Sequence, residues 1–262
     1  MLQKIKFAVL YIIYYIYKDK IFGGISMENQ MTFYAPTETE RKLFLTRTYL
    51  WMGIALLVSA AVSFFAAESG LIISILKATG GIGLIILCIA EIGLVVGLTS
   101  SIRRISVANA RILFILYSAL NGLTISTIFF TYTASSIAVC FVSAAAMFFG
   151  MSIYGLKTKS DLTTAGRYLM MALLGIIIAS LLNGILFLFG AGSTMFDWLI
   201  SVVSVVVFTG LTAYDSQKIM RISSKADSSD AFKKIAIYGA LELYLDFINI
   251  FLSLLRLFGN RK

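Results

Sequence analysis

The sequence contains no histidine and has few charged residues of any kind. Charged residues make up 13% of the 262 positions and hydrophobic residues make up 59%. A soluble globular domain carries about 25% charged residues, so this composition excludes an ordinary soluble fold. The absence of histidine removes the usual catalytic base and the commonest zinc ligand. The two cysteines, Cys88 and Cys140, lie in apolar runs and are expected to be small core residues rather than a disulfide.

Seven apolar runs are long enough to cross a bilayer, which takes about 20 residues of helix. They are Thr48–Ala67, Gly81–Ser100, Val107–Phe130, Ala134–Leu156, Tyr168–Phe189, Phe196–Tyr214 and Ile235–Phe258. The start of the second run is ambiguous, because Leu71–Leu76 is also apolar and Lys77 interrupts it. The sequence predicts an all-α polytopic membrane protein with one seven-helix domain over residues 48–258 and a short tail over 259–262.

Lysine and arginine gather in alternate connections, whereas the other connections carry only Lys77. Because cytoplasmic loops retain these residues, we expect the amino terminus of the bundle to lie in the cytoplasm. The net charge of +9 follows from the same bias, so no nucleic-acid partner is expected. The connection between the sixth and seventh runs is predicted to hold Lys218, Arg221, Lys225, Lys233 and Lys234.

The tail does not fit this charge bias, since Arg256, Arg261 and Lys262 would lie outside if the last run crosses the membrane. Either the tail violates the bias or the last run is re-entrant and ends inside. We favour crossing, because the run is long and continuous.

The first 26 residues are predicted to lie outside the fold, followed by a cytoplasmic segment over residues 27–47. Ile5–Tyr17 is apolar but too short to span comfortably, and no convincing cleavage site follows it. It could be a signal peptide, an interfacial amphipathic helix or a leader upstream of a true start at Met27. We favour the leader and expect a chain that begins at Met27 to insert normally.

Polar residues inside the last apolar run are the most informative feature of the sequence. They recur at helical spacing and so form one stripe on an otherwise apolar helix: Glu242, Asp246, Asn249 and Ser253. A carboxylate is expensive in lipid and almost always faces a protein interior or a water-filled path. We therefore expect the last helix at the centre of the bundle, lining an ion pathway.

Asp215 ends the sixth run and supplies a second carboxylate, directly after Tyr214, which is also expected to line the ion pathway. Two carboxylates that meet in low dielectric cannot both ionise cheaply, so such a pair shares a proton and titrates as a unit. Oxygen ligands also suit calcium, which makes Asp215, Asp246 and Glu242 candidate ligands for that ion. The alternative is a fixed hydrogen-bonded cluster that only holds the helices in register.

Other polar and small residues have weaker interpretations. Glu91 in the second run either faces the same pathway or pairs with a neighbouring helix. Asn121 and Asn183 are expected to form hydrogen bonds between helices. The glycines of the second run are predicted to be positions of close helix packing: Gly81, Gly83, Gly93 and Gly97.

Two stretches resemble the Bax inhibitor-1 family, also called the transmembrane Bax inhibitor motif or lifeguard family. The more specific is Leu-Tyr-Leu-Asp-Phe-Ile-Asn, residues 243–249, followed by Leu-Leu-Arg at 254–256; the second is Tyr-Asp-Ser-Gln at 214–217. The resemblance covers roughly residues 41–259. Two features depart from the family pattern: Glu242 stands where a small residue is more usual, and the distance from Glu91 to the arginine pair Arg103 and Arg104 is one residue longer.

The resemblance implies a bundle in which six helices wrap the last one. It also implies the pH-sensitive calcium leak of bacterial members, and so a location in a bacterial inner membrane. It implies that Asp215 and Asp246 form the proton sensor and that Arg103, with Arg104 as second choice, latches Asp215 in the closed state. Loss of this latch on protonation favours opening as the pH falls, whereas repulsion between two ionised carboxylates favours opening at high pH. We expect the former.

Two other classes of membrane protein share some of these features. Intramembrane aspartyl proteases also place one aspartate after a tyrosine, as in Tyr214-Asp215, but they need Gly-x-Gly-Asp around the second aspartate and a Pro-Ala-Leu motif. Here Asp246 follows Leu245, and the only proline is Pro36. We therefore expect no enzymatic activity and no cofactor. The remaining alternative is a membrane partner that modulates a membrane protease or translocon.

Overall fold

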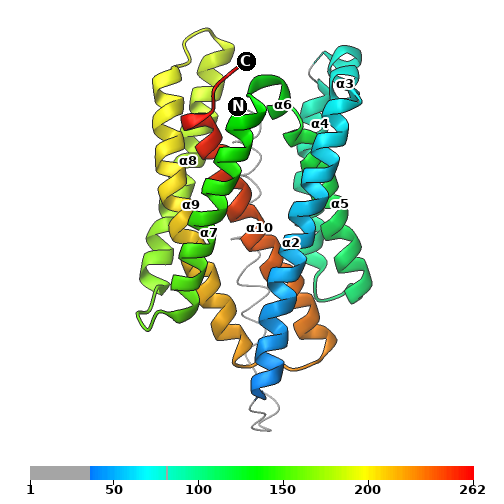
Figure 1. The fold of residues 1–262 in the computed structure, drawn as a ribbon, viewed down its shortest axis with the longest axis vertical. Helices are drawn as coiled ribbons and strands as arrows, with labels where there is room; N and C mark the ends of the chain where they lie inside the picture. The colour runs from blue at the N-terminus through cyan, green and yellow to red at the C-terminus, as the bar shows by residue number, and fades with distance from the viewer. Residues whose placement is uncertain (1–35, 81) are drawn as a thin grey trace.

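The computed structural model describes residues 36–80 and 82–262, and its long elements are helices (Figure 1). They are α2 Glu38–Glu68, α3 Leu71–Thr79, α4 Ile82–Ser101, α5 Val107–Ile125, α6 Ile128–Thr131, α7 Ala134–Lys157, α8 Thr163–Leu188, α9 Thr194–Ser223 and α10 Asp230–Phe258. In this part of the chain seven helices are long and apolar enough to span a membrane, which confirms the predicted number. The predicted leader and Met27 fall outside the described residues.

The last helix, α10, lies at the centre of the bundle, as predicted (Figure 1). Of its most apolar 18-residue window 94% is buried, against 28–50% for the other spans. It packs against α9, α2, α7 and α5. The outer helices instead expose large apolar side chains such as Leu57, Val142 and Met171. A membrane supplies the apolar surroundings that these side chains need, so the inside of the bundle is where polar groups can gather.

Two helices extend beyond their apolar runs. Thr37 caps α2 in a reciprocal capping box with Glu40, and α9 continues past Tyr214 as far as Ser223. The prediction that Lys218 and Arg221 lie in a connecting loop is therefore wrong, and it is wrong for Lys233 and Lys234 too, because α10 already begins at Asp230. Backbone hydrogen bonding continues without regard to side-chain polarity, and neither proline nor glycine interrupts residues 211–223.

Two short helices, α3 and α6, lie at the edges of the predicted runs. Leu71–Thr79 forms α3, which Gly80 ends in the left-handed conformation at φ 58°; glycine adopts this conformation without steric cost. The third apolar run, predicted as continuous, is divided into α5 and α6 at Ser126 and Thr127. These short helices lie at the same end of the bundle as the carboxyl terminus (Figure 1).

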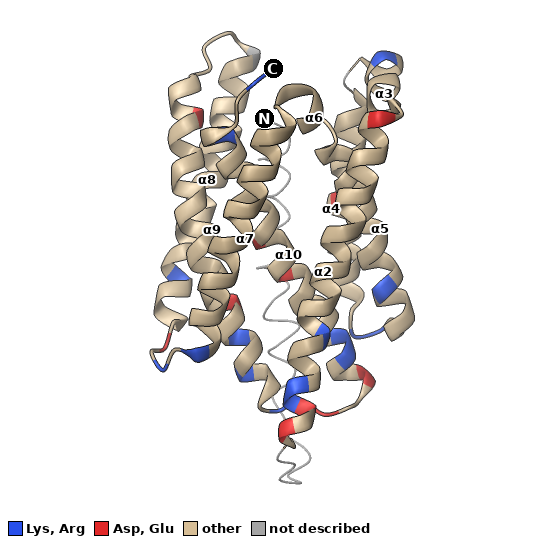
Figure 2. Cartoon of the chain, viewed as in Figure 1, with Lys and Arg blue, Asp and Glu red and all other residues tan. Residues whose placement is uncertain are grey.

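Lysine and arginine side chains concentrate at the opposite end, where α2 begins and where α4–α5, α7–α8 and α9–α10 connect (Figure 2). This arrangement agrees with the predicted orientation, and we refer to this end as cytoplasmic. The carboxyl terminus lies at the other end, so α10 crosses the bundle and the re-entrant alternative is excluded.

The tail is docked on the connection between α6 and α7. The backbone N–H of Thr133 donates to Asn260 O at 3.0 Å, and that of Lys262 donates to Thr131 O at 3.0 Å. The Lys262 ammonium donates to Phe129 O at 2.8 Å. Arg256, by contrast, belongs to α10, where its guanidinium donates to Ser201 and Ser253 and is attracted by Asp197. Local partners thus hold the side chains of Arg256 and Lys262, two of the three cations that the charge bias did not explain.

The prediction of close packing at the glycines of the second run is largely wrong. A Cβ added at Gly93 or Gly97 would meet no atom within 4 Å, whereas one at Gly83 would contact α3; Gly81 lies outside the described residues. The close helix contacts occur elsewhere, at Gly122 against the backbone of Ser59 and at Gly155 against the backbone of Ala213. Which glycine meets a neighbour is decided by tertiary packing.

Replacing Gly155 by alanine should destabilise the bundle by about 1–3 kcal/mol, the usual cost of overpacking. The new Cβ would overlap the carbonyl oxygen of Ala213, which belongs to a helix backbone and cannot rotate away. Equilibrium unfolding in mixed micelles measures the effect. Gly93→Ala is the matched control and should cost nothing, because that position is open and alanine favours a helix. Equal stability of the two variants would contradict the close contact of α7 with α9.

Candidate functional site

The site lies where α9 and α10 pack side by side at mid-length. Each helix begins at a serine cap, Ser193 for α9 and Ser229 for α10, with an aspartate in the first turn to complement the helix dipole. The chain reverses between the helices, so α9 runs toward the cytoplasmic end and α10 runs away from it (Figure 1). Residues that follow one another along α9 therefore meet residues in the reverse order along α10.

Asp215 and Asp246 meet at this interface, as predicted. Both are 0% exposed. The Asp246 carboxyl group lies within hydrogen-bonding reach of the Asp215 carboxyl group. No N–H or O–H group of another described residue donates to either oxygen of Asp246. A proton shared between the two carboxyl groups is the arrangement that satisfies this contact.

Lys218 and Glu242 form a second pair one turn nearer the cytoplasmic end. The Lys218 ammonium donates to Glu242 Oε1 in a salt bridge whose side chains are only 12% and 2% exposed. Lys218 follows Asp215 by three residues and Glu242 precedes Asp246 by four, so the antiparallel helices bring both pairs into register. Sequence reasoning missed Lys218 because it was assigned to a loop; its helical spacing from Asp215 was the available signal.

Tyr238 completes the cluster on α10, one further turn toward the cytoplasm. Its ring lies under the Lys218 ammonium, with 5.7 Å between Nζ and the ring centroid, a cation–π contact. Its hydroxyl group interacts with the Asp215 carboxyl group. We name Tyr238, Glu242, Asp246, Asp215 and Lys218 the carboxyl cluster.

The outer part of the predicted stripe has other partners. The Asn249 amide donates to Leu245 O of its own helix at 2.8 Å, and Ser253 Oγ accepts from Arg256 at 3.0 Å. Both residues are buried. The Tyr214 side chain is turned toward α8, where its ring lies against Gly166. The ion-pathway roles predicted for these three residues stay predictions.

Glu91 lies at the interface of α4 with α5, where Thr124 Oγ1 donates to its carboxylate. This contact agrees with the interpretation that Glu91 pairs with a neighbouring helix. Arg103 and Arg104 are exposed in the α4–α5 connection, and the Lys234 ammonium ties this connection to α10 through Arg103 O at 2.9 Å. Asp215 is fully buried whereas Arg103 is exposed, so the latch between these two residues stays a prediction.

The predicted asparagine contacts between helices are present. The Asn121 amide on α5 donates to the Tyr244 hydroxyl on α10, which also shares a 2.7 Å hydrogen bond with Ser59 of α2. This network joins α2, α5 and α10. Its central residue, Tyr244, lies between Glu242 and Asp246 in the sequence. The side-chain amide of Asn183 on α8 accepts a hydrogen bond from Ser193 N at 3.1 Å and donates one to Ser193 O at 3.2 Å, and so fixes the start of α9.

Gln217 explains the last position of the Tyr-Asp-Ser-Gln motif. Its side chain accepts from Leu162 N at 2.9 Å and donates to Ser160 O at 2.7 Å, which joins α9 to the α7–α8 connection. In that connection, the hydrogen bonds from Thr163 and then the Arg221 guanidinium hold the pKa of Asp161 below its ordinary value. The contacts of Asp161 with Thr163 and Arg221 therefore stabilise the connection at neutral pH, and they weaken as the pH falls through the pKa of Asp161 in the folded state.

The candidate calcium ligands do not form a preformed metal cage. Among the described residues, no three histidine, cysteine, aspartate or glutamate side chains are grouped to hold a metal ion, and Lys218 already occupies one oxygen of Glu242. Binding of a resident calcium ion by Asp215, Asp246 and Glu242 together therefore has no support in this conformation. Their role as calcium ligands stays a prediction.

Comparison with known proteins identifies the family. A model described as "Inhibitor of apoptosis-promoting Bax1" matches residues 41–262. The chain belongs to the Bax inhibitor-1 family. It is 46% identical over 221 residues to the "Inner membrane protein YbhL" of Escherichia coli (strain K12), which covers 84% of this chain and 92% of the relative. A protein of Borreliella burgdorferi is 42% identical over 220 residues, with 84% and 92% covered, and protein RP147 of Rickettsia prowazekii is 38% identical over 221 residues, with 84% and 90% covered.

Family membership and the seven spans make this an integral membrane protein. The match begins at residue 41, close to the start of α2 at Glu38, and continues to the last residue. It includes the described helices from α3 to α10, with both members of the aspartate pair and with Lys218 and Glu242.

Proposed function

We propose that the chain forms a calcium leak pathway whose opening is controlled by protonation of Asp215 and Asp246. The observation that supports this most strongly is the meeting of two fully buried carboxyl groups on the central helix and its neighbour in a membrane bundle. Ionisable groups in this position mark ion and proton pathways. The name of the E. coli relative supports placing the chain in a bacterial inner membrane.

The charge balance of the cluster favours cations. Three ionised carboxyl groups carry a charge of −3. The proton shared by the aspartates and the Lys218 ammonium each add +1, which leaves a net charge of −1. Lys218 attracts both Glu242 and Asp246. A second proton on the aspartate pair removes the anion that attracts Lys218 on α9 toward Asp246 on α10. We therefore expect α9 and α10 to separate more readily, and the leak to rise, as the pH falls.

Purified protein in vesicles that contain a calcium-sensitive dye tests the proposal between pH 5 and pH 8. The expected result is a calcium leak that depends on protein and increases toward acid pH. An increase toward alkaline pH would keep the aspartate pair as sensor but would assign opening to repulsion between ionised carboxylates. A chain that conducts no calcium at any pH would overturn the proposal and would favour a role as a membrane partner of another protein.

Arg103→Ala should raise the leak at neutral pH, if its guanidinium holds Asp215 in the closed state. The matched control is Arg104→Ala, which removes the same charge from the adjacent exposed position. Dye-loaded vesicles at one fixed pH measure both variants. Equal leak from the two would remove Arg103 from the gate and leave the α9–α10 cluster as its only component.

A further inference from the structure

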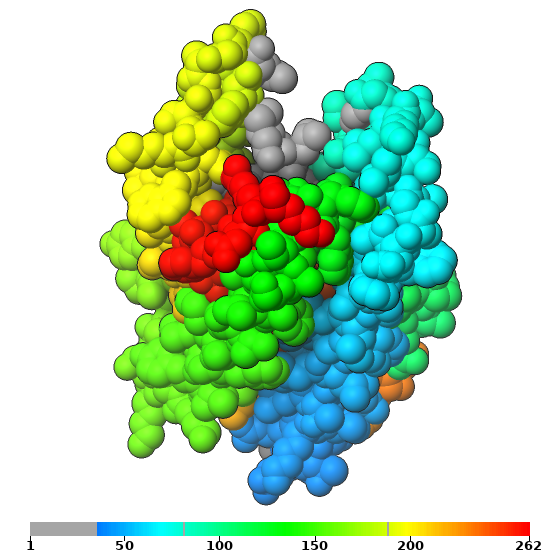
Figure 3. Space-filling model, turned by 45° about the horizontal axis from the view of Figure 1, so that its top comes forward, coloured from blue at the N-terminus to red at the C-terminus, as the bar shows by residue number. Residues whose placement is uncertain are grey.

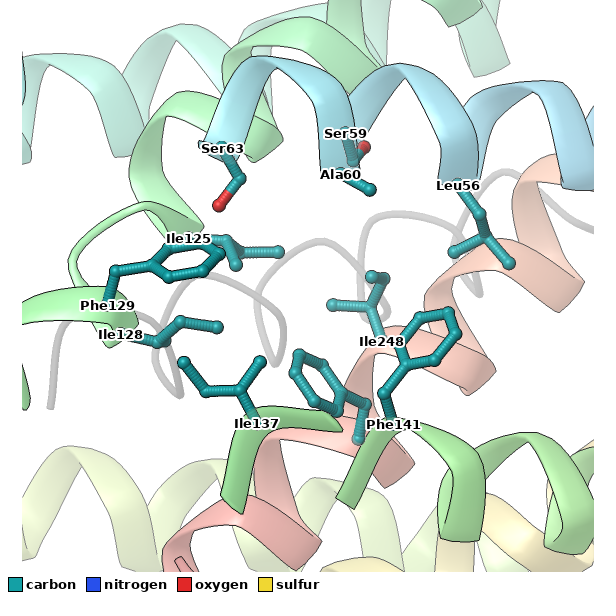
Figure 4. Close-up of a pocket in the computed structure, with 11 residues that line it drawn as sticks. Leu56, Ser59, Ala60, Ser63, Ile125, Ile128, Phe129, Ile137, Phe141 and Ile248 are labelled. Atoms are coloured by element: carbon teal, nitrogen blue, oxygen red, sulfur yellow. The ribbon is translucent and has the colours of Figure 1, made fainter. Parts of the chain in front are cut away.

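An apolar cavity of about 100 Å³ lies between α2 and α7, on the outer side of the carboxyl cluster. Its floor is formed by Ile248 and Phe251 of α10, and its outer end by Ile125, Ile128 and Phe129 from α5 and α6 (Figure 4). Nine of the eleven lining side chains are apolar. Apolar cavities of about 150 Å³ stay dry and take hydrocarbon ligands, so water is a poor occupant here.

Figure 3 shows α2 (blue) and α7 (green) side by side on one face of the molecule, and the cavity opens between these helices where its lining is exposed. Ala60 of α2 and Phe141 of α7 line it and are nevertheless exposed, Phe141 by 41%. Leu57, on the same face of α2 as Ala60, is 72% exposed, and Val139 on the outward side of α7 is 65% exposed. In a bilayer this surface faces acyl chains, so the cavity is continuous with the lipid-facing surface of the bundle.

One polar group inside the cavity has no partner. Ser63 is 3% exposed, and its hydroxyl group forms no hydrogen bond with any described residue. Its oxygen points into the space between α2 and α6 (Figure 4). A buried hydroxyl group without a partner costs free energy, and it can donate to an ester carbonyl. Ser63 lies five residues before the end of α2, about 7–8 Å along the helix.

We propose that this cavity binds the acyl chain of a membrane phospholipid. The chain enters between α2 and α7, lies against Ile248 and Phe251, and receives a hydrogen bond from Ser63 at its ester end. This site is separate from the carboxyl cluster and does not depend on the proposed calcium leak.

A tryptophan reporter tests the site from inside. In a chain with Trp51→Phe and Trp198→Phe, Phe251→Trp places a single fluorophore on the cavity floor, at a residue only 5% exposed. In vesicles of phosphatidylcholine with brominated acyl chains, its emission should be quenched nearly as strongly as that of Val139→Trp on the lipid-facing surface. Phe114→Trp, buried beside Tyr244 and away from the cavity, should not be quenched.

Closing the mouth with Ala60→Phe should relieve the quenching of Phe251→Trp and leave Val139→Trp unchanged. Quenching of Phe251→Trp by aqueous acrylamide, and not by brominated lipid, would show a wet vestibule and overturn the proposal. Resistance to both quenchers would show a closed cavity and overturn it too.

The unmodified chain provides a second measurement that does not depend on folding of the variants. A phosphatidylcholine with a photoactivatable group in its acyl chain should label α10 at Ile248 or Phe251. Labelling confined to the outward faces of α2 and α7 would contradict the proposal.

Discussion

Lys218→Met should destabilise the folded bundle by about 3–5 kcal/mol, the cost of leaving one member of a buried ion pair without its partner. Glu242 is 2% exposed at its side chain and would lose the ammonium that donates to it. Glu242→Leu should cost a similar amount, since it leaves Lys218 buried without its carboxylate. Equilibrium unfolding in mixed micelles measures both.

The double variant Lys218→Met with Glu242→Leu should recover most of the loss, because neither charge then remains buried alone. Lys233→Met is the matched control. Lys233 pairs with Asp230 at 2.8 Å, but the Asp230 side chain is 75% exposed, and pairs of this kind contribute about 0–1 kcal/mol. A cost for Lys218→Met no greater than that of the control would show that the buried pair does not hold α9 to α10.

The Lys218–Glu242 pair also shows a limit of prediction from the sequence, because hydropathy does not locate the end of α9. Hydropathy marks where a helix stops being apolar, and so it ended the sixth span at Tyr214, whereas backbone hydrogen bonding continues to Ser223. Lys218 was therefore counted among loop cations. Glu242 was recognised as unusual, but its partner could be found only once Lys218 was placed on the helix that faces it.

The central position of α10 was predictable because lipid penalises its polar stripe and a protein interior does not. The contact of Asp215 with Asp246 followed from the family resemblance and from the need of each carboxyl group for polar surroundings. Close packing was not predictable in the same way. Gly93 and Gly97 look like packing positions, yet both face open space, while Gly155 meets Ala213. Glycine content shows where helices can approach, and only the assembled bundle shows where they do.

The carboxyl tail illustrates a third limit. Counted as charges, Arg256, Arg261 and Lys262 contradict the orientation of the chain. In the structure Arg256 is bound by serines within the bundle, and the backbone of residues 260–262 bonds to the α6–α7 connection. The positive-inside rule is a statistical bias over loops, and cations with local partners are a physical reason for an exception.

Asp215→Asn should raise the calcium leak at neutral pH by about tenfold or more and flatten its dependence on pH. Asparagine has the shape of a protonated aspartate but carries no charge at any pH, so the variant should behave at neutral pH as the wild type does in acid. A hydrogen bond to a charged group contributes about 1.5–3 kcal/mol, and 1.4 kcal/mol corresponds to a tenfold change in an equilibrium. Vesicles with a calcium dye measure the leak from pH 5 to pH 8.

Asp246→Asn should flatten the profile in the same way, because in the proposed sensor the two aspartates titrate as one unit and removing either member removes the shared proton. Asp230→Asn makes the same chemical change on α10 at an exposed position and should keep the wild-type profile. The stability of each variant must be measured alongside, since a partly unfolded bundle could also leak. Folded Asp215→Asn and Asp246→Asn proteins that keep the wild-type profile would mean that the carboxyl cluster only holds α9 and α10 in register, because a sensor cannot lose its titrating group and still respond.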